Sequence, residues 1–115
     1  MSLVAVEAAI RLNDPSVRAE LIARTAPIQQ QTRDEEPGCL VYCFAPDPCV
    51  ADFIQVYELW ESEADLAAHL RHENYFAMRE TLGAGGLASA VSRKHRIDAT
   101  AAVYDENGQP NADFD

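Results

Sequence analysis

The sequence predicts one α+β domain whose elements follow the order β-α-β-β-α-β around an antiparallel sheet. The chain has 115 residues, which is close to one ordinary domain, and 48% of them are hydrophobic, which is enough for a buried core. Short apolar runs with β-branched and aromatic residues alternate with longer segments of helical periodicity. Clusters of Pro, Gly, Asn and Asp separate these segments, and no internal repeat is visible.

The first strand and helix are predicted in the N-terminal third of the chain. Residues 3–12 are apolar with β-branched members and contain no strand breaker. Asp14 can cap a helix that has Pro15 at its first position. This helix is expected over residues 15–33, with a kink or a break at Pro27, because proline lacks the backbone donor that a helix interior needs.

A turn at residues 36–38 leads into two consecutive strands. The runs 39–45 and 52–60 are rich in aromatic and β-branched residues. The connection between them, residues 46–51, is short and contains two prolines. The two strands are therefore expected to pair as a hairpin.

The second helix and the last strand follow. Ser62 with Asp65 three residues later resembles a capping box, so a helix is expected over residues 63–82. The polar stretch 71–74 is a candidate interruption of this helix. A more polar strand is expected over residues 88–98, after a glycine-rich loop.

These elements divide the chain into a folded domain and a tail. We expect a domain over residues 1–100 and an acidic, partly disordered C-terminal tail over residues 101–115, which lacks periodicity. The order β-α-β-β-α-β is the ferredoxin-like split βαβ plan, with both helices on one face of the sheet.

Both faces of the predicted sheet are apolar. In the strand 52–60, Phe53, Tyr57 and Leu59 alternate with residues that point to the opposite face. Two helices can cover only one face, so the second face needs a partner, and an identical sheet is the simplest one. We therefore expect a homodimer whose two sheets pack into a barrel-like core, a dimeric α/β barrel.

Charge and cysteine content exclude several classes of function. The net charge of −10 argues against binding to nucleic acid or to an anionic membrane surface. No apolar run approaches the roughly 20 residues of a membrane span, and the N-terminus lacks the features of a secretory signal, so a cytoplasmic location is expected. Three cysteines without metal-ligand spacing are expected to be reduced thiols, and no metal site is predicted.

Several short motifs resemble the antibiotic biosynthesis monooxygenase family over roughly residues 3–98. They are an acidic turn before a strand, a strand that ends in Glu-x-Trp, and a helix in which His precedes an aromatic pair: Glu36-Pro37-Gly38-Cys39, Tyr42, Tyr57-Glu58-Leu59-Trp60-Glu61-Ser62, His69-Leu70 and Tyr75-Phe76. The resemblance implies the dimeric α/β-barrel group of small cofactor-free oxygenases and their relatives, and so no metal, flavin or haem. The haem-degrading branch is a poor match, because no histidine occurs near Met78 to Glu80. The anthrone branch has an asparagine where this chain has Val56.

The residues that could support this chemistry lie on two elements. Glu58 and Trp60 are two apart on one strand and share a face, and His69 lies on the apolar side of the second helix. An imidazole titrates near pH ~6.5, which makes His69 the candidate base, with Glu58 orienting it. The alternative is a half-buried histidine that is bonded to Glu58 or to a carbonyl without a catalytic role.

The remaining candidates are substrate-binding residues. Trp60 could form a flat wall of the pocket, Tyr75 and Phe76 could line or close it, and Arg79 could hold an oxyanion, although packing or solvation alone would also explain each of them. The leading hypothesis is a small cofactor-independent monooxygenase that acts on an aromatic, quinol-like or enolic small molecule. A non-enzymatic dimeric small-molecule-binding protein of the same fold and a cofactor-free isomerase are the alternatives.

Overall fold

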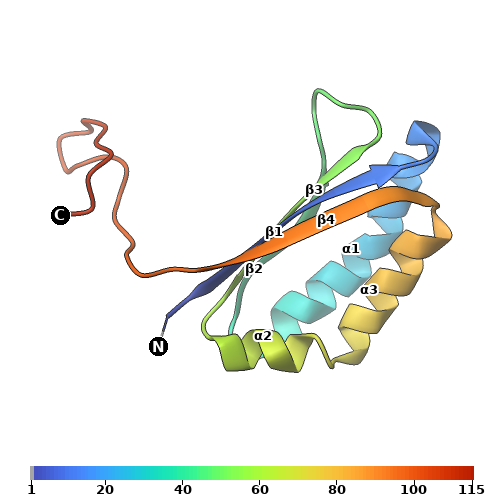
Figure 1. The fold of residues 1–115 in the computed structure, drawn as a ribbon, viewed down its shortest axis with the longest axis horizontal. Coiled ribbons are helices and arrows are strands. Elements are labelled where there is room, and N and C mark those ends of the chain that lie inside the picture. Colours follow the sequence, from blue (N-terminus) through green and yellow to red (C-terminus); the bar gives the residue numbers. More distant parts are fainter. Residues whose placement is uncertain (1) are drawn as a thin grey trace.

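The chain forms a four-stranded antiparallel sheet with three α-helices against one of its faces (Figure 1). The computed structural model describes residues 2–115. The strands are ordered β2-β3-β1-β4 across the sheet and comprise β1 (Val4–Leu12), β2 (Cys39–Pro46), β3 (Phe53–Trp60) and β4 (Leu87–Arg96). A 3-10 turn (Pro15–Val17) precedes α1 (Arg18–Glu35), and the other helices are α2 (Glu63–His69) and α3 (Glu73–Ala84). The ferredoxin-like α+β fold is thus confirmed, and within one chain the sheet is open.

The single helix predicted over residues 63–82 is divided into two, close to the candidate interruption at residues 71–74. α2 ends at His69 and α3 begins at Glu73, because Leu70 to His72 form a turn rather than a continuous helix. Ser62 caps α2 by accepting a hydrogen bond from the backbone N–H of Asp65 at 3.1 Å. The turn lets α3 change direction, so both short helices can follow the sheet.

A kink or a break was predicted at Pro27, and the helix is not broken there. α1 runs through Pro27 as one element, and this residue is exposed. The helix carbonyl that loses its partner therefore lies on the solvent side, where water can satisfy it. The buried side of the helix carries Leu21 and three polar residues at helical spacing: Thr25, Gln29 and Thr32.

α1 also covers the outer edge of the sheet. Gln29 lies against β2, where its Oε1 accepts a hydrogen bond from Phe44 N at 3.0 Å and its Nε2 donates to Phe44 O at 3.3 Å. Arg33 Nε donates to Tyr42 O at 2.8 Å. Side chains of the helix therefore replace the strand that would otherwise pair with β2.

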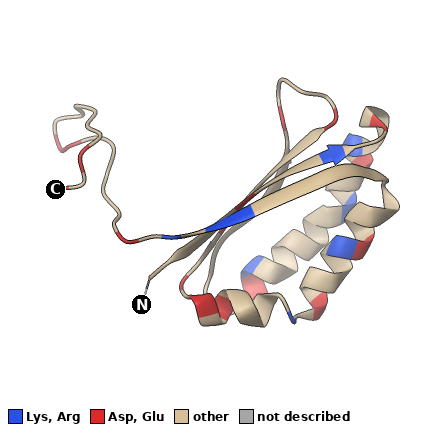
Figure 2. Ribbon diagram, viewed as in Figure 1, with Lys and Arg blue, Asp and Glu red and all other residues tan. Residues whose placement is uncertain are grey.

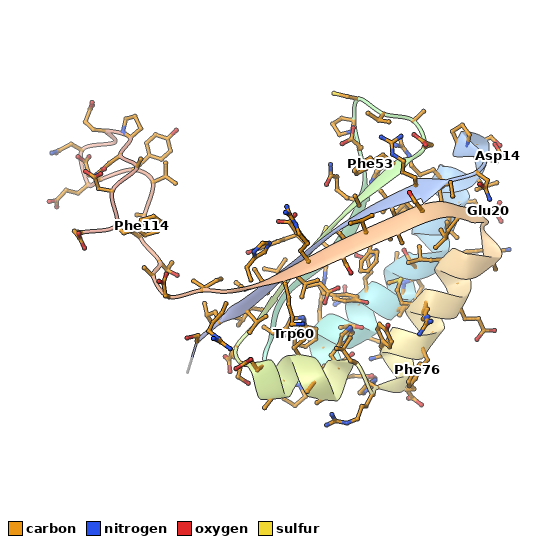
Figure 3. The ribbon with its side chains drawn as sticks, in the orientation of Figure 1. Asp14, Glu20, Phe53, Trp60, Phe76 and Phe114 are labelled. Atoms are coloured by element: carbon orange, nitrogen blue, oxygen red, sulfur yellow. The ribbon has the colours of Figure 1, made fainter. Side chains whose placement is uncertain are left out.

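The core lies between the sheet and the helices. Alternate residues of the strands point toward the helices, as their pleat requires. The buried apolar set is Val4, Ile10 and Leu12 on β1, Tyr42 and Phe44 on β2, Ile54, Val56 and Trp60 on β3, and Leu21, Leu66, Met78 and Leu82 on the helices. Figure 3 shows Trp60 between the sheet and α2.

The other face of the sheet is uncovered in the single chain (Figure 1). It carries the apolar residues that the alternation assigns to the second face, of which Tyr57 and Val91 are exposed by 46% and 64%. The partly buried members are Val41, Cys43, Ala45, Phe53 and Leu59. We call this set, with Tyr57 and Val91, the open face.

The C-terminal tail leaves the end of β4 and extends away from the body (Figure 1). All residues from 98 to 115 are exposed. Residues 104 and 110 form an isolated bridge around a tight turn, and Phe114 lies far from the sheet (Figure 3). The division of the chain at residue 100 stays a prediction.

None of the helices within residues 2–115 is both long enough and apolar enough to cross a membrane.

Candidate active site

A glycine turn brings a carboxylate under the second helix. Gly38 has φ +79°, a left-handed conformation that favours glycine, and an added Cβ would collide with Asp65 at the start of α2. The carbonyl of Gly38 accepts a hydrogen bond from Glu61 N at 2.9 Å. The turn is therefore held tightly against α2, and Glu36, which directly follows α1, is buried.

Glu36 and His69 form a buried hydrogen-bonded pair. His69 Nδ1 lies 2.7 Å from Glu36 Oε1, and the two side chains are 1% and 3% exposed. Asn74 Nδ2 donates to the second oxygen of Glu36 at 3.1 Å. An ionised carboxylate only accepts hydrogen bonds. We therefore place a hydrogen on His69 Nδ1, which donates a hydrogen bond to Glu36. The lone pair of the neutral ring is then on Nε2, the nitrogen that acts as a base.

This geometry corrects the predicted pairing of His69 with Glu58. Glu58 Oε1 instead accepts a hydrogen bond from Trp60 Nε1 at 3.0 Å. The two residues are adjacent on the same face of β3, so the indole reaches the carboxyl group directly. Glu58 therefore occupies the site without holding the imidazole.

Aromatic rings fix the orientation of the imidazole. Its centroid lies 4.6 Å from Trp60, 5.2 Å from Tyr42 and 5.6 Å from Tyr75. Among the residues that the structure describes, His69 Nε2 has no hydrogen-bond partner, and the ring lines a cavity. Nε2 is thus available to a bound molecule.

The cavity next to His69 has a volume of about 310 Å³. This is at the lower end of the range for small-molecule sites, roughly 300–1,000 Å³. Its apolar wall comes from the sheet and from the region of α2 and the turn after it: Val6, Ala8, Ile10, Phe44, Val56, Leu66 and Leu70. Its polar and charged lining residues are Glu58, His69, Tyr75, Ser92, Arg93 and Lys94. A second cavity of about 270 Å³ continues along the sheet and shares Glu58 and Tyr75 with the first. A third, of about 390 Å³, adjoins at Leu66 but contains neither Glu58 nor His69, so the first is the candidate active site.

The predicted site residues fall into three groups. His69, Glu58 and Tyr75 line the first cavity, and Arg79 lines the second. Trp60 is fully buried behind Glu58 and His69, so it positions these groups rather than forming a wall of the cavity. Phe76 is 53% exposed on α3 and lines neither cavity (Figure 3).

Burial raises the pKa of two groups beside the cavity. Desolvation raises the pKa of Glu58, and the hydrogen bond from Trp60 and the charge of His69 oppose this only in part. Burial, reinforced by the carboxylates of Glu58 and Glu36, also raises the pKa of the Tyr42 phenol far above its ordinary value. Glu58 is therefore biased toward its neutral, proton-donating form, and Tyr42 is not a base.

Burial likewise raises the pKa of the Cys39 thiol to about 11. Such a thiol is unreactive at neutral pH. All three cysteines are free in the structure, with Cys39 and Cys43 partly buried and Cys49 exposed.

We expect Glu58→Gln to raise the melting temperature at pH 8 and to leave it unchanged near pH 4. Because the pKa of Glu58 is raised above 4.5 in the folded state, its contribution to stability is complete below that pH and is lost as the pH rises through the folded value. Glutamine keeps an acceptor for the indole but has no such loss. Differential scanning calorimetry at several pH values measures the difference in melting temperature between the variant and the wild type. Each kcal/mol of unfolding free energy corresponds to about 2–8 °C. A variant less stable than the wild type at pH 8 contradicts the assignment; Glu61→Gln, at an exposed site, is the control.

His72 is more structural than the sequence suggested. Its position in the polar stretch 71–74 favours a solvent-exposed side chain, which is 34% exposed in the structure, but its Nδ1 also caps α3 by accepting a hydrogen bond from Asn74 N at 3.0 Å. The same nitrogen is 3.8 Å from Glu36, and since it already accepts, it does not donate to that carboxylate. His72 therefore positions Asn74 and, through it, Glu36.

Sequence reasoning missed Glu36, Asn74 and Lys94 as site residues. Glu36 was interpreted as part of a turn and of a family motif but not as a site residue, yet it is the partner of a histidine 33 positions away. A signal was available, because a carboxylate directly before Pro-Gly is held in a fixed place by the turn. Lys94 lines the first cavity from β4 and was not considered.

No group of three or more His, Cys, Asp or Glu side chains within residues 2–115 is arranged to hold a metal ion.

Solved structures from several bacteria share this fold. A protein from Caulobacter crescentus CB15 that is provisionally assigned as an antibiotic biosynthesis monooxygenase is 23% identical, with a TM-score of 0.75 over 87% of this chain and 92% of that one. A Deinococcus radiodurans protein with the same provisional assignment is 16% identical, with a TM-score of 0.73 over 89% and 99% of the two chains. Rv0793 from Mycobacterium tuberculosis is 23% identical, with a TM-score of 0.73 over 88% and 100%. At these identities the likeness establishes the fold alone.

The family follows from the sequence itself. The sequence pattern that defines the antibiotic biosynthesis monooxygenase family matches residues 3–81. The chain therefore belongs to this family. No curated protein matches the chain in sequence.

Proposed function

We propose that this protein is a small cofactor-independent monooxygenase that acts on an aromatic, quinol-like or enolic compound. The observation that carries this proposal is the buried Glu36–His69 pair, whose free Nε2 is next to an apolar cavity. A base inside an apolar site is what an acidic C–H or O–H group needs in order to lose its proton. Family membership supports the reaction class, and the substrate class is our inference from the site.

The residues have distinct roles in this proposal. His69 Nε2 takes a proton from the substrate, and the charge of Glu36 stabilises the imidazolium that results. The substrate anion gives one electron to dioxygen, and the two radicals combine into a peroxide. Loss of water from the peroxide then leaves one oxygen atom in the product and the other in water. Glu58, whose raised pKa favours the protonated form, can supply a proton to the departing oxygen.

The test is oxygen uptake over a panel of quinols, hydroxynaphthalenes and anthrones. We expect uptake above the rate of autoxidation for at least one compound, with one oxygen atom from ¹⁸O₂ appearing in the product. The absence of enzyme-dependent uptake over the panel contradicts the proposal. A cofactor-free isomerase would exchange a substrate proton with solvent deuterium without oxygen uptake, and a binding protein would do neither.

We also propose that two copies associate through the open face. Tyr57 and Val91 are large exposed apolar side chains on that face, and the helices cover the opposite one.

We propose a cytoplasmic location as well, on the composition alone.

We expect a homodimer that buries more than about 1,000 Å² in total, to be measured by multi-angle light scattering at micromolar concentration. Tyr57→Glu should shift the protein toward monomer, because it places a charge in the interface. Phe76→Glu is the matched control, since Phe76 is an exposed aromatic on the helical side. A wild-type monomer, or equal loss of dimer in both variants, contradicts this proposal.

A further inference from the structure

We propose that Lys94 binds a carboxylate of the substrate, so that the cavity selects aromatic or enolic acids over neutral compounds of the same shape. The claim that the other end of such a molecule reacts beside His69 rests on the proposed function. The recognition of its carboxylate rests on the position of Lys94 and can be tested without turnover.

The strand register places Lys94 across the cavity from Glu58. Lys94 on β4 pairs with Val6 on β1, and Val6 pairs with Glu58 on β3. The three residues form one row on the helix-facing side of the sheet, and all three line the first cavity. Two strand spacings separate the ends of this row, about 10 Å between backbones. A molecule lying over Val6 can therefore have one end at Glu58 and His69 and the other end at Lys94.

Lys94 differs from its neighbours in having no carboxylate partner. It belongs to the basic run 93–96, whose lysine and arginines are blue in Figure 2. Arg93 and His95 contact the two oxygens of Glu7 at 2.7 and 3.0 Å, and Arg96 contacts Glu63 at 3.1 Å. Among the described residues, no carboxylate lies within salt-bridge distance of Lys94. The only lysine of a chain with a net charge of −10 thus keeps its charge available beside the cavity.

The chemistry of the site favours one carboxylate over other groups. An ammonium on a flexible stem is a point charge that can reach a single anionic group at the rim of a pocket. Of the described residues that line the first cavity, Arg93 and Lys94 are the Lys and Arg side chains, and the guanidinium of Arg93 is held by Glu7. The charge of Lys94 matches one negative charge better than the two of a phosphate. The floor between the two ends is Val6 with Ala8 beside it on β1, which suits an aromatic ring.

The experiment measures binding of an unreactive probe pair. Naphthalene-2-carboxylate and naphthalene-2-carboxamide have the same ring and nearly the same shape but differ in charge. Their affinities are measured by NMR titration of the wild type, Lys94→Met and Arg93→Met. Arg93 is the matched control, because this adjacent basic residue of β4 also lines the first cavity but has its side chain bound to Glu7.

We expect the wild type to bind the carboxylate about tenfold more tightly than the amide, and Lys94→Met to lose this preference. Arg93→Met should keep it, and the preference should fall at high salt because the pair is exposed. Equal affinity of the wild type for both probes, no binding of either at millimolar concentration, or an unchanged preference in Lys94→Met overturns the proposal.

The two proposals can fail separately. His69→Asn should keep the preference for the carboxylate even though it removes the proposed base. If carboxylate selection depends on Lys94 but no quinol is oxidised, the acid-binding site stands and the monooxygenase proposal fails. If a quinol is oxidised and Lys94→Met does not change selectivity, the monooxygenase proposal stands and the acid-binding proposal fails.

Discussion

His69→Asn is expected to lower kcat by about 10²- to 10⁴-fold on any substrate found in the quinol panel, the usual contribution of a general base. Asparagine can place an amide N–H near the position of Nδ1 and so keep the hydrogen bond to Glu36, while Nε2 is removed. The fold should therefore survive, which circular dichroism and light scattering can check. His69→Ala should show a similar loss of turnover with lower stability, because Glu36 then loses one of its two buried donors.

The matched control is His95→Ala. His95 is an exposed histidine on the other side of the sheet, where it contacts Glu7. The variant His95→Ala should keep wild-type turnover. His72→Ala is a poor control, because His72 caps α3. If His69→Asn oxidises the substrate at the wild-type rate, the proposed base is removed, and only an apolar pocket that holds a self-oxidising compound near dioxygen is left.

Glu36→Gln is expected to lower kcat by about 10- to 100-fold without unfolding the protein. The glutamine oxygen can still accept from His69 Nδ1, and Asn74 can rotate its amide to accept from the new NH₂ group. What is lost is the negative charge that stabilises the imidazolium, so the effect should fall on kcat more than on KM. Steady-state oxygen uptake, with a thermal melt of the same sample, separates this loss from misfolding.

A double variant makes the test sharper. If Glu36 acts through His69, then Glu36→Gln combined with His69→Asn should be no slower than His69→Asn alone. Additive losses would instead mean that Glu36 affects the site by another route. Glu35→Gln, at the exposed neighbouring residue, is the control.

The sequence predicted the strand order along the chain and the side of the second helix on which His69 lies. These follow from local rules, because strand alternation places Glu58 with Trp60 and helical spacing places His69 with Leu66. The interruption of the helix near residues 71–74 was visible as a polar stretch. The predicted strand over residues 88–98 is observed as Leu87–Arg96, within the usual error at element ends.

What could not be predicted depends on distant packing. The hydrogen bond from His69 to Glu36 joins the end of α1 to the end of α2, and local spacing cannot show which of two carboxylates the ring will meet. Thr25, Gln29 and Thr32 are polar, so hydrophobic periodicity could not assign these three residues to the buried side of α1. The continuity of α1 through Pro27 follows from its solvent-facing position, which only the packed structure defines.

The edge of β2 restricts how copies of this protein can associate. A free strand edge can recruit a strand of another molecule, and repeated recruitment leads to open-ended fibres. Here the amide of Gln29 and the guanidinium of Arg33 already bind the backbone groups of β2, so this edge cannot grow by strand addition. The opposite edge, β4, carries Lys94, and a charged lysine on an edge strand disfavours the addition of an identical strand beside it. With growth hindered at both edges, the proposed face-to-face association would give a closed pair in place of a filament.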